Sequence, residues 1–232
     1  MKNLSIIIPI FNEIKTIEDL LKKVLKINVG KQLIVVDDGS KDGSIDILKK
    51  YKKKIDKIII HKKNQGKGAA IRSGQKYVKG KYVVIQDADL EYNPSDIIKL
   101  LRVIKKKKLK AIYGSRVLNK KKKENTQNFT ARIRIFANFL LTKISNYINN
   151  QNLTDAHTCY KMFESKLFKK IKLKENGFAF CPEVTTKISK MNIKISEFPI
   201  SYKGRTYDEG KKITFFDGLD ALYVLIKFRY FK

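Results

Sequence analysis

The stretch YVVIQDAD, residues 82–89, joins a continuous apolar run to two carboxylates, Asp87 and Asp89, that stand one residue apart. A run that is apolar at nearly every position, and not at every second one, is typical of a strand buried on both faces of a sheet. We therefore expect a buried strand over residues 82–87. Four other runs have the same character, at residues 4–9, 32–37, 57–60 and 111–114.

Segments with a helical spacing of apolar residues lie between these runs. The clearest follows Thr16, a residue type that can cap a helix, and places Ile17, Leu20, Leu21 and Val24 on one face. Similar patterns cover residues 44–50, 67–78 and 94–105. Alternating strands and helices indicate an α/β fold with a mostly parallel sheet flanked by helices.

Polar residues follow three of the predicted strands. These clusters are Asn12 with Glu13, Asp37 with Asp38, and Asp87 with Asp89. In sheets of this kind the ligand binds at the carboxyl ends of the strands, where the connecting loops meet. We therefore expect three acidic loops to converge on one edge of the sheet.

The composition indicates an anionic partner. The chain has 51 Lys and Arg against 22 Asp and Glu, a formal net charge of +29, and its 43% of hydrophobic residues suffices for a core. Such an excess suits nucleic acid, an anionic membrane surface or a phosphorylated substrate. The basic residues are dispersed, and runs such as residues 105–108 and 120–123 are equally explained as solvated loop edges. Without a nucleic-acid-binding signature, we expect no nucleic acid partner.

Cysteine and histidine are scarce. Cys159 and Cys181 form no CxxC pair, and His61 and His157 are far apart, so a zinc site is not expected and a reducing cytosol is the natural compartment. No apolar stretch approaches the roughly 20 residues needed to span a bilayer. The apolar residues 215–231 are interrupted by charges, so they can lie on a membrane but are not expected to cross it.

A long helix is expected over residues 129–148, after a change of pattern near residue 117. Its apolar residues recur at spacings of three and four, and Arg132, Arg134 and Lys143 lie between them. Two interpretations stand side by side. The apolar stripe either packs on the sheet or lies in a membrane interface, with the basic residues on anionic headgroups.

Asp87 and Asp89 suit a divalent cation. Alternate carboxylates at a strand end can hold Mg²⁺ or Mn²⁺, which would bridge the phosphates of a nucleotide diphosphate. Asp37 and Asp38 can contact a base or ribose at the next strand end, although one of them can equally order its own loop. Lys67 lies in the glycine-containing loop NQGKGAA, residues 64–70, where a helix begins and an anion is favoured. That loop is not GxGxxG, which argues against a dinucleotide dehydrogenase.

The order of these motifs resembles family 2 glycosyltransferases. The matching stretches are PIFNE at 9–13, VDDGS at 36–40, NQGKG at 64–68, DAD at 87–89 and GSR at 114–116. Two more, TDAHTCYK at 154–161 and SYKGRTYDEGKK at 201–212, are similar to those of dolichyl- or polyprenyl-phosphate glucose or mannose synthases. The resemblance spans nearly the whole chain and is less specific for the donor sugar.

The resemblance implies a GT-A fold, with nucleotide-sugar binding in residues 1–116 and an acceptor-binding, membrane-facing half in residues 117–232 of one catalytic domain. It assigns the nucleotide sugar to Pro9, Asn12, Glu13, Asp37, Asp38, Lys67, Asp87, Ala88 and Asp89. It assigns the metal, Mg²⁺ or Mn²⁺, to Asp87, Asp89 and Glu91. It assigns the acceptor phosphate to Arg116, Arg132, Arg205, Lys211 and Lys212, and catalysis to Asp155, Asp89, Arg116 and Arg205.

The implied reaction is an inverting transfer of glucose or mannose from a nucleotide diphosphate sugar to a polyprenyl phosphate. The alternative acceptor is a hydroxyl of a cell-surface polysaccharide or lipopolysaccharide precursor. A lipid phosphate is already anionic near neutral pH, so Asp155 would orient cations there, whereas a hydroxyl would need it as a base. We expect peripheral association with the cytoplasmic face of a membrane, directly or through a membrane-protein partner.

Overall fold

The protein is built around one mostly parallel sheet, described by a computed structural model over residues 2–118, 129–205 and 215–231. Its seven strands lie in the order β3-β2-β1-β4-β6-β5-β7. They are β1 (Leu4–Ile10), β2 (Lys31–Asp37), β3 (Lys57–Ile60), β4 (Tyr82–Ile85), β5 (Ala111–Ser115), β6 (Lys161–Glu164) and β7 (Ser196–Pro199). Only β6 runs antiparallel, between β4 and β5. The predicted fold class is confirmed.

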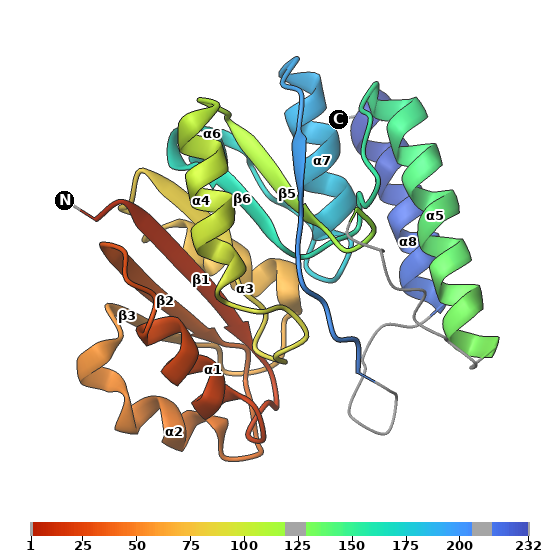
Figure 1. The fold of residues 1–232 in the computed structure, drawn as a ribbon. Helices are drawn as coiled ribbons and strands as arrows, with labels where there is room; N and C mark the ends of the chain where they lie inside the picture. Colours follow the sequence, from red (N-terminus) through yellow and green to blue (C-terminus); the bar gives the residue numbers. More distant parts are fainter. Residues whose placement is uncertain (1, 119–128, 206–214, 232) are drawn as a thin grey trace.

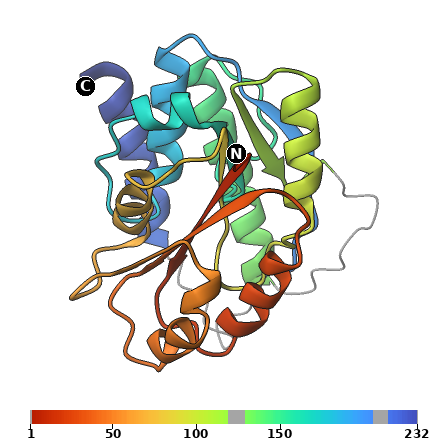
Figure 2. The ribbon, with the colours of Figure 1, turned by 90° about the vertical axis from the view of Figure 1, so that its left-hand side faces the viewer.

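Helices cover both faces of the sheet, as the continuous apolar runs require. In β1, Ile6 and Ile8 belong to the core on one face, and Ile7 belongs to the core on the other. The first core contains residues of α1 (Ile17–Leu25), α2 (Ser44–Lys50) and α4 (Asp96–Lys106). The second contains residues of α3 (Lys67–Gln75), α6 (Ser165–Lys170) and α7 (Phe180–Lys190). Figure 2 shows α3 and α4 on opposite sides of the sheet.

Two further helices form an outer layer. They are α5 (Phe129–Asn149) and α8 (Phe215–Ile226), and α8 continues into the π-helical turn η2 (Lys227–Phe231). Both pack on α7 and on each other, on the side of α7 that faces away from the sheet (Figure 1). No helix among the described residues is both long and apolar enough to cross a membrane.

The local predictions differ from the structure mainly at element ends. β4 ends at Ile85, two residues before the expected end, and α3 ends at Gln75 instead of residue 78. Thr16 stands at the N-cap of α1, but its hydroxyl donates to Glu13 and caps no backbone N–H of the helix. The short strands β6 and β7 were not expected, because both contain charged residues and have no continuous apolar run.

The arrangement of β1 between β2 and β4 creates the position at which ligands bind in such sheets. The chain builds outward to β3 in one direction and to β7 in the other, and the loops after β1, β2 and β4 lie together at the carboxyl edge. β6 and β7, from the second half of the chain, complete the same sheet. The segment after β7 then runs past this edge, as Figure 1 shows.

Candidate active site

Asp37 and Asp38 lie at the end of β2 and are almost completely buried. One oxygen of Asp37 accepts hydrogen bonds from the backbone N–H groups of Gly39 and Ser40, at 3.1 and 2.9 Å. Its Oδ2 is buried and accepts none from the described residues. The two carboxylates therefore shape their loops, and contact with a nucleoside stays a prediction.

Asp38 organises the loop that precedes α3. Its carboxylate pairs with His61 Nδ1 at 2.6 Å and accepts the backbone N–H groups of Gln65 and Gly66, at 3.0 and 2.7 Å. Gly66 has φ +98°, and a Cβ there would lie 2.4 Å from the carbonyl oxygen of Asn176. Glycine is needed at this position for both reasons. Asp38 thereby fixes the start of α3.

Lys67, the first residue of α3, reaches the acidic loop after β4. Its Nζ lies 2.6 Å from Oδ1 of Asp87, and both side chains are mostly buried. Burial lowers the pKa of Lys67, but Asp87, acting together with Cys159 and Cys181, outweighs burial and raises that pKa well above its ordinary value. Asp38, the loop and Lys67 thus connect the loops after β2 and β4, and the acidic loops converge as expected.

Asp89 lies beside a second cation, Arg205. Arg205 donates to both carboxylate oxygens of Glu13, at 3.0 and 3.1 Å, and its Nη2 lies 3.4 Å from Oδ2 of Asp89. Burial, followed by the charges of Asp87 and Glu91, raises the pKa of Asp89 to about 7. The site therefore favours positive charge next to Asp89.

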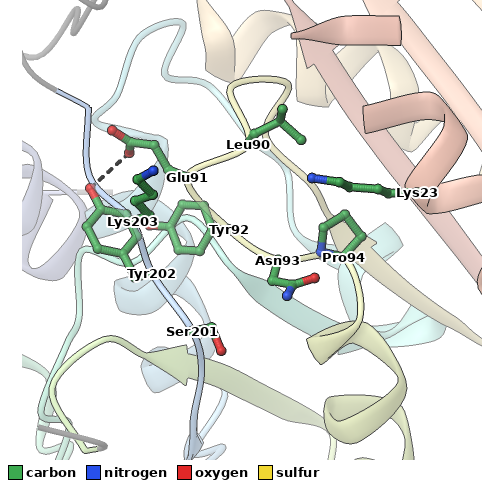
Figure 3. Close-up of a pocket in the computed structure, with 9 residues that line it drawn as sticks. All are labelled: Lys23, Leu90, Glu91, Tyr92, Asn93, Pro94, Ser201, Tyr202 and Lys203. Atoms are coloured by element: carbon green, nitrogen blue, oxygen red, sulfur yellow. Dashed lines mark hydrogen bonds between the residues drawn. The ribbon is translucent and has the colours of Figure 1, made fainter. Parts of the chain in front are cut away.

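Glu91 is engaged with the segment after β7, which we call the strap and define as residues 200–205. Its Oε2 accepts the hydroxyl of Tyr202 at 2.9 Å, and its Oε1 accepts the backbone N–H of Arg205 at 2.7 Å. Its backbone carbonyl also accepts Lys203 N–H at 2.9 Å. The dashed line in Figure 3 marks the Tyr202 contact. Glu91 therefore fastens the strap, and its predicted role as a metal ligand stays a prediction.

A small cavity of about 230 Å³ lies where the strap crosses the loop after β4. Figure 3 shows Lys23 pointing toward it from α1, while Leu90 and Pro94 line it from the loop. Ser201 and Lys203 line it from the strap. The cavity lies beside the acidic cluster, and Glu91 is the one predicted site residue among the described residues that line it.

The donor set around Asp89 fits a divalent cation shared with a substrate. No group of three His, Cys, Asp or Glu side chains suited to a metal occurs within the described residues. Three acidic side chains follow β4. Lys67 pairs with Asp87 at 2.6 Å and the strap engages Glu91, whereas the cation nearest to Asp89, Arg205, lies 3.4 Å away. Mg²⁺ commonly binds through one or two carboxylates plus substrate phosphates. A diphosphate would therefore have to supply the remaining ligands.

Arg116 and Asp155 form a buried bidentate ion pair on the other side of Tyr202. Arg116 Nε lies 2.6 Å from Oδ2 and Nη2 lies 2.7 Å from Oδ1 of Asp155, which is fully buried. Asn138 of α5 donates to Oδ1 at 3.4 Å. Burial would raise the pKa of Asp155, but the guanidinium of Arg116 outweighs burial and lowers it. The Arg116 guanidinium lies 5.1 Å from the ring centroid of Tyr202.

The loop that carries Asp155 is held by side chains that the sequence did not reveal. Glu197 of β7 accepts the backbone N–H of Asp155 at 2.9 Å and that of Thr154 at 2.6 Å. The side-chain amide of Asn146 in α5 donates to the carbonyl oxygen of Leu153 at 2.7 Å and accepts the N–H of Leu153 at 2.9 Å. Glu197 carried no recognisable signal, because it lies outside the matching stretches and in a segment without a continuous apolar run. Tyr202, in contrast, lies in the family-matching stretch at residues 201–212.

The remaining predicted residues fall into three groups. Pro9 in β1 and Ala88 are buried, and their contact with a nucleotide sugar stays a prediction. Asn12 is exposed and ties the loop after β1 to that after β2, through Ser40 and Lys41. Outside the described part of the chain lie the side chain of Arg132 and residues Lys211 and Lys212.

Comparison with known proteins places the chain in a family. The model of glycosyl transferase family 2 matches residues 5–172. The uncharacterized protein MJ0544 of Methanocaldococcus jannaschii is 30% identical over 205 residues, 84% of this chain and 86% of that protein. Dolichyl-phosphate beta-glucosyltransferase ALG5D of Trichomonas vaginalis is 27% identical over 215 residues, which cover 85% of this chain and 65% of that enzyme.

A solved structure shares the fold. Glucosyl-3-phosphoglycerate synthase from Mycobacterium tuberculosis, in complex with Mn²⁺, uridine diphosphate and phosphoglyceric acid, matches with a TM-score of 0.71 at 14% identity. The match covers 100% of this chain and 80% of that chain. This likeness shows the GT-A fold. The family model, which matches more than half of the chain, establishes that the chain belongs to glycosyl transferase family 2.

Proposed function

We propose that the protein transfers glucose or mannose, with inversion, from a nucleotide diphosphate sugar to a polyprenyl phosphate. The observation that carries this proposal is the pairing of two sites across Tyr202: an acidic cluster around Asp89 and the partly exposed guanidinium of Arg116, which the buried Asp155 holds. The first suits a cation with a diphosphate, and the second suits a phosphate acceptor. The name of the Trichomonas relative supports the same acceptor class.

The chemistry needs positioning more than proton transfer. An oxygen of the acceptor phosphate attacks the anomeric carbon while the bond from that carbon to the nucleoside diphosphate breaks. Arg116, fixed by Asp155, would hold the acceptor phosphate in line, and Arg205 would neutralise a phosphate of either substrate. Bound Mg²⁺ or Mn²⁺ would supply charge stabilisation to the departing diphosphate, held there by Asp89.

The hydroxyl acceptor is the second candidate, and it would require Asp155 as a base. Both oxygens of Asp155 are engaged with Arg116, and its pKa is lowered despite burial because of that guanidinium. A carboxylate in this state is a weak base for a sugar hydroxyl. These contacts favour the phosphate acceptor.

We further propose that the protein works at the cytoplasmic face of a membrane, associated peripherally or through a membrane-protein partner. A polyprenyl phosphate is anchored in a bilayer, so its phosphate is presented at the headgroup layer. The net charge of +29 favours an anionic surface.

The experiment is a transfer assay with a short-chain polyprenyl phosphate in detergent, Mn²⁺, and UDP-glucose or GDP-mannose as donor, followed by mass spectrometry. A hexosyl phosphate product is expected with one donor, and it should be lost with a chelator or in Asp89→Asn. The matched control is Asp46→Asn, which removes an exposed carboxylate of α2. Absence of product with both donors, or product that survives chelation and Asp89→Asn, would reject the proposal.

A further inference from the structure

The outer faces of α5 and α8 are apolar although they face away from the protein. On α5, Phe136, Phe139 and Leu140 are 65%, 53% and 49% exposed. On α8, Leu219 and Tyr223 are 51% and 61% exposed. Most of the exposed large apolar side chains in the described part of the chain lie on these two helices and on η2. Figure 1 shows the two helices side by side at one end of the molecule. A concentration of exposed apolar side chains on two adjacent helices is typical of an interaction site.

Helix α5 is amphipathic in the reverse sense to an ordinary surface helix. The face that packs on the protein carries Asn138, Thr142, Ser145 and Asn149, at helical spacings of four, three and four. The last three are almost completely buried. Most of these polar groups have partners: Thr142 accepts the backbone N–H of Ala156 at 3.3 Å, for example, whereas the buried Oδ1 of Asn149 accepts no hydrogen bond from the described residues. Phe136 and Leu140 of the apolar stripe are exposed, so of the two interpretations of this helix the structure does not support packing of the stripe on the sheet.

This reversal has a thermodynamic consequence. Burying apolar area is worth about 25 cal/mol per Å², so folding in water alone would favour the opposite orientation of α5. The hydrogen bonds from Asn138 and Asn149 to Asp155 and Thr186 hold the helix this way round. The apolar face of α5 is therefore available to contact an apolar surface outside the protein.

We propose that the outer face of α5 and α8 docks the protein on an anionic lipid bilayer, with both helices lying along the headgroup layer. The charge of these segments argues for this occupant, because the sequences of α5, α8 and η2 contain five basic residues against two acidic ones. The basic residues are Arg132, Arg134, Lys143, Lys227 and Arg229, and the acidic residues are Asp217 and Asp220. Tyr147 and Tyr223, 89% and 61% exposed, are of the amphipathic aromatic type found at headgroup level. Such a helix lies on a membrane without crossing it.

The docking surface adjoins the acceptor site, so this inference rests on the proposed function and deepens it. The inner face of α5 contacts Asp155 through Asn138, and Asp155 holds Arg116. A helix with its side chains is about 10 Å across. A lipid-borne phosphate at headgroup depth would therefore lie about one helix diameter from the guanidinium that we expect to bind it.

The test compares vesicle binding of the wild-type chain with that of Phe136→Ser/Phe139→Ser/Leu219→Ser. Wild-type protein should co-sediment with phosphatidylcholine vesicles that contain phosphatidylglycerol, and less with phosphatidylcholine alone. The triple variant should bind at least about tenfold more weakly, since it removes three large apolar side chains from the contact. The control is Ile60→Ser, which alters a 52% exposed side chain on β3 and should bind as wild type.

Three outcomes would overturn the docking proposal: absence of wild-type binding, equal binding of the triple variant, or a wild-type dimer that the triple variant converts to monomer while vesicle binding is absent. Circular dichroism checks folding, and Phe136→Ser alone serves if the triple variant unfolds. The triple variant should still transfer sugar to a short-chain phosphate without vesicles. Vesicle binding without any transfer by the wild-type chain would reject the proposed function and leave the docking surface standing.

Discussion

Two nitrogens of the Arg116 guanidinium donate to the two carboxylate oxygens of Asp155, at 2.6 and 2.7 Å, although 39 positions separate these residues in the chain. A bidentate pair of this kind fixes the plane of the guanidinium as well as its position. Asp155 is fully buried, and Arg116 has a side chain that is 21% exposed. The cation therefore keeps part of its surface exposed, whereas the carboxylate that holds it is buried.

Asp155→Asn tests whether this carboxylate orients Arg116 or acts as a base. With a phosphate acceptor we expect the KM for the acceptor to rise and kcat/KM to fall by about tenfold. Loss of a general base typically costs a factor of about 100 to 10,000. Steady-state kinetics across pH is the measurement. A larger fall in kcat, with disappearance of the acidic limb of the pH profile, would identify Asp155 as the base.

The same variant gives a prediction for stability against pH. The pKa of Asp155 is lower in the folded protein than its unfolded value of about 3.9. The contribution of the ion pair is therefore present above that pH and is lost as the pH falls through the folded-state value. We expect Asp155→Asn to lose about 3 kcal/mol of unfolding free energy at pH 7, and the deficit to shrink below about pH 4. Urea titrations measure it, and a deficit that does not depend on pH would contradict the assignment.

Glu91→Ala should release the strap. The variant removes acceptors for Tyr202 and for the backbone of Arg205, and hydrogen bonds to a charged group are each worth about 1.5–3 kcal/mol. We expect trypsin to cleave after Lys203 or Arg205 at least about tenfold faster. Mass spectrometry of timed digests measures this. Asp46→Ala is the control, and equal cleavage in both variants would show that Glu91 does not hold the strap.

Glu91→Gln separates strap fastening from metal binding. Because both oxygens of Glu91 are engaged with the strap, we expect Mn²⁺ affinity in the presence of UDP to change less than about threefold. Asp89→Asn should weaken it more than about tenfold. Electron paramagnetic resonance of Mn²⁺ reports the affinity without any turnover. Equal weakening by the two substitutions would restore Glu91 as a metal ligand.

Glu197→Gln should loosen the loop of Asp155. Two backbone N–H groups donate to Glu197, and an amide can accept through only one of its two terminal atoms. We expect a loss of about 2 kcal/mol in unfolding free energy and a raised KM for the acceptor, with kcat nearly unchanged. Acceptor kinetics and urea unfolding provide both numbers. An unchanged KM would show that Glu197 supports the fold without positioning Arg116.

The sequence by itself determined the buried strands, the alternating helices and the edge where the acidic loops meet. Each of these follows from local patterns: apolar runs predict buried strands, and parallel strands send their loops to one edge. Residues 57–60 were predicted with their observed bounds, and the predicted helix over residues 129–148 differs by one residue from α5. The ordered motifs then pointed to the family that the comparison established.

Only the tertiary structure decided which charge faces which. Arg205 pairs with Glu13 across 192 positions, and Glu197 supports Asp155 across 42, because β6 and β7 enter the sheet beside β4 and β5. No local pattern encodes that order. The orientation of α5 was equally hidden. Periodicity places apolar residues on one face of a helix, but the hydrogen-bonding partners that the rest of the chain offers decide which face turns inward.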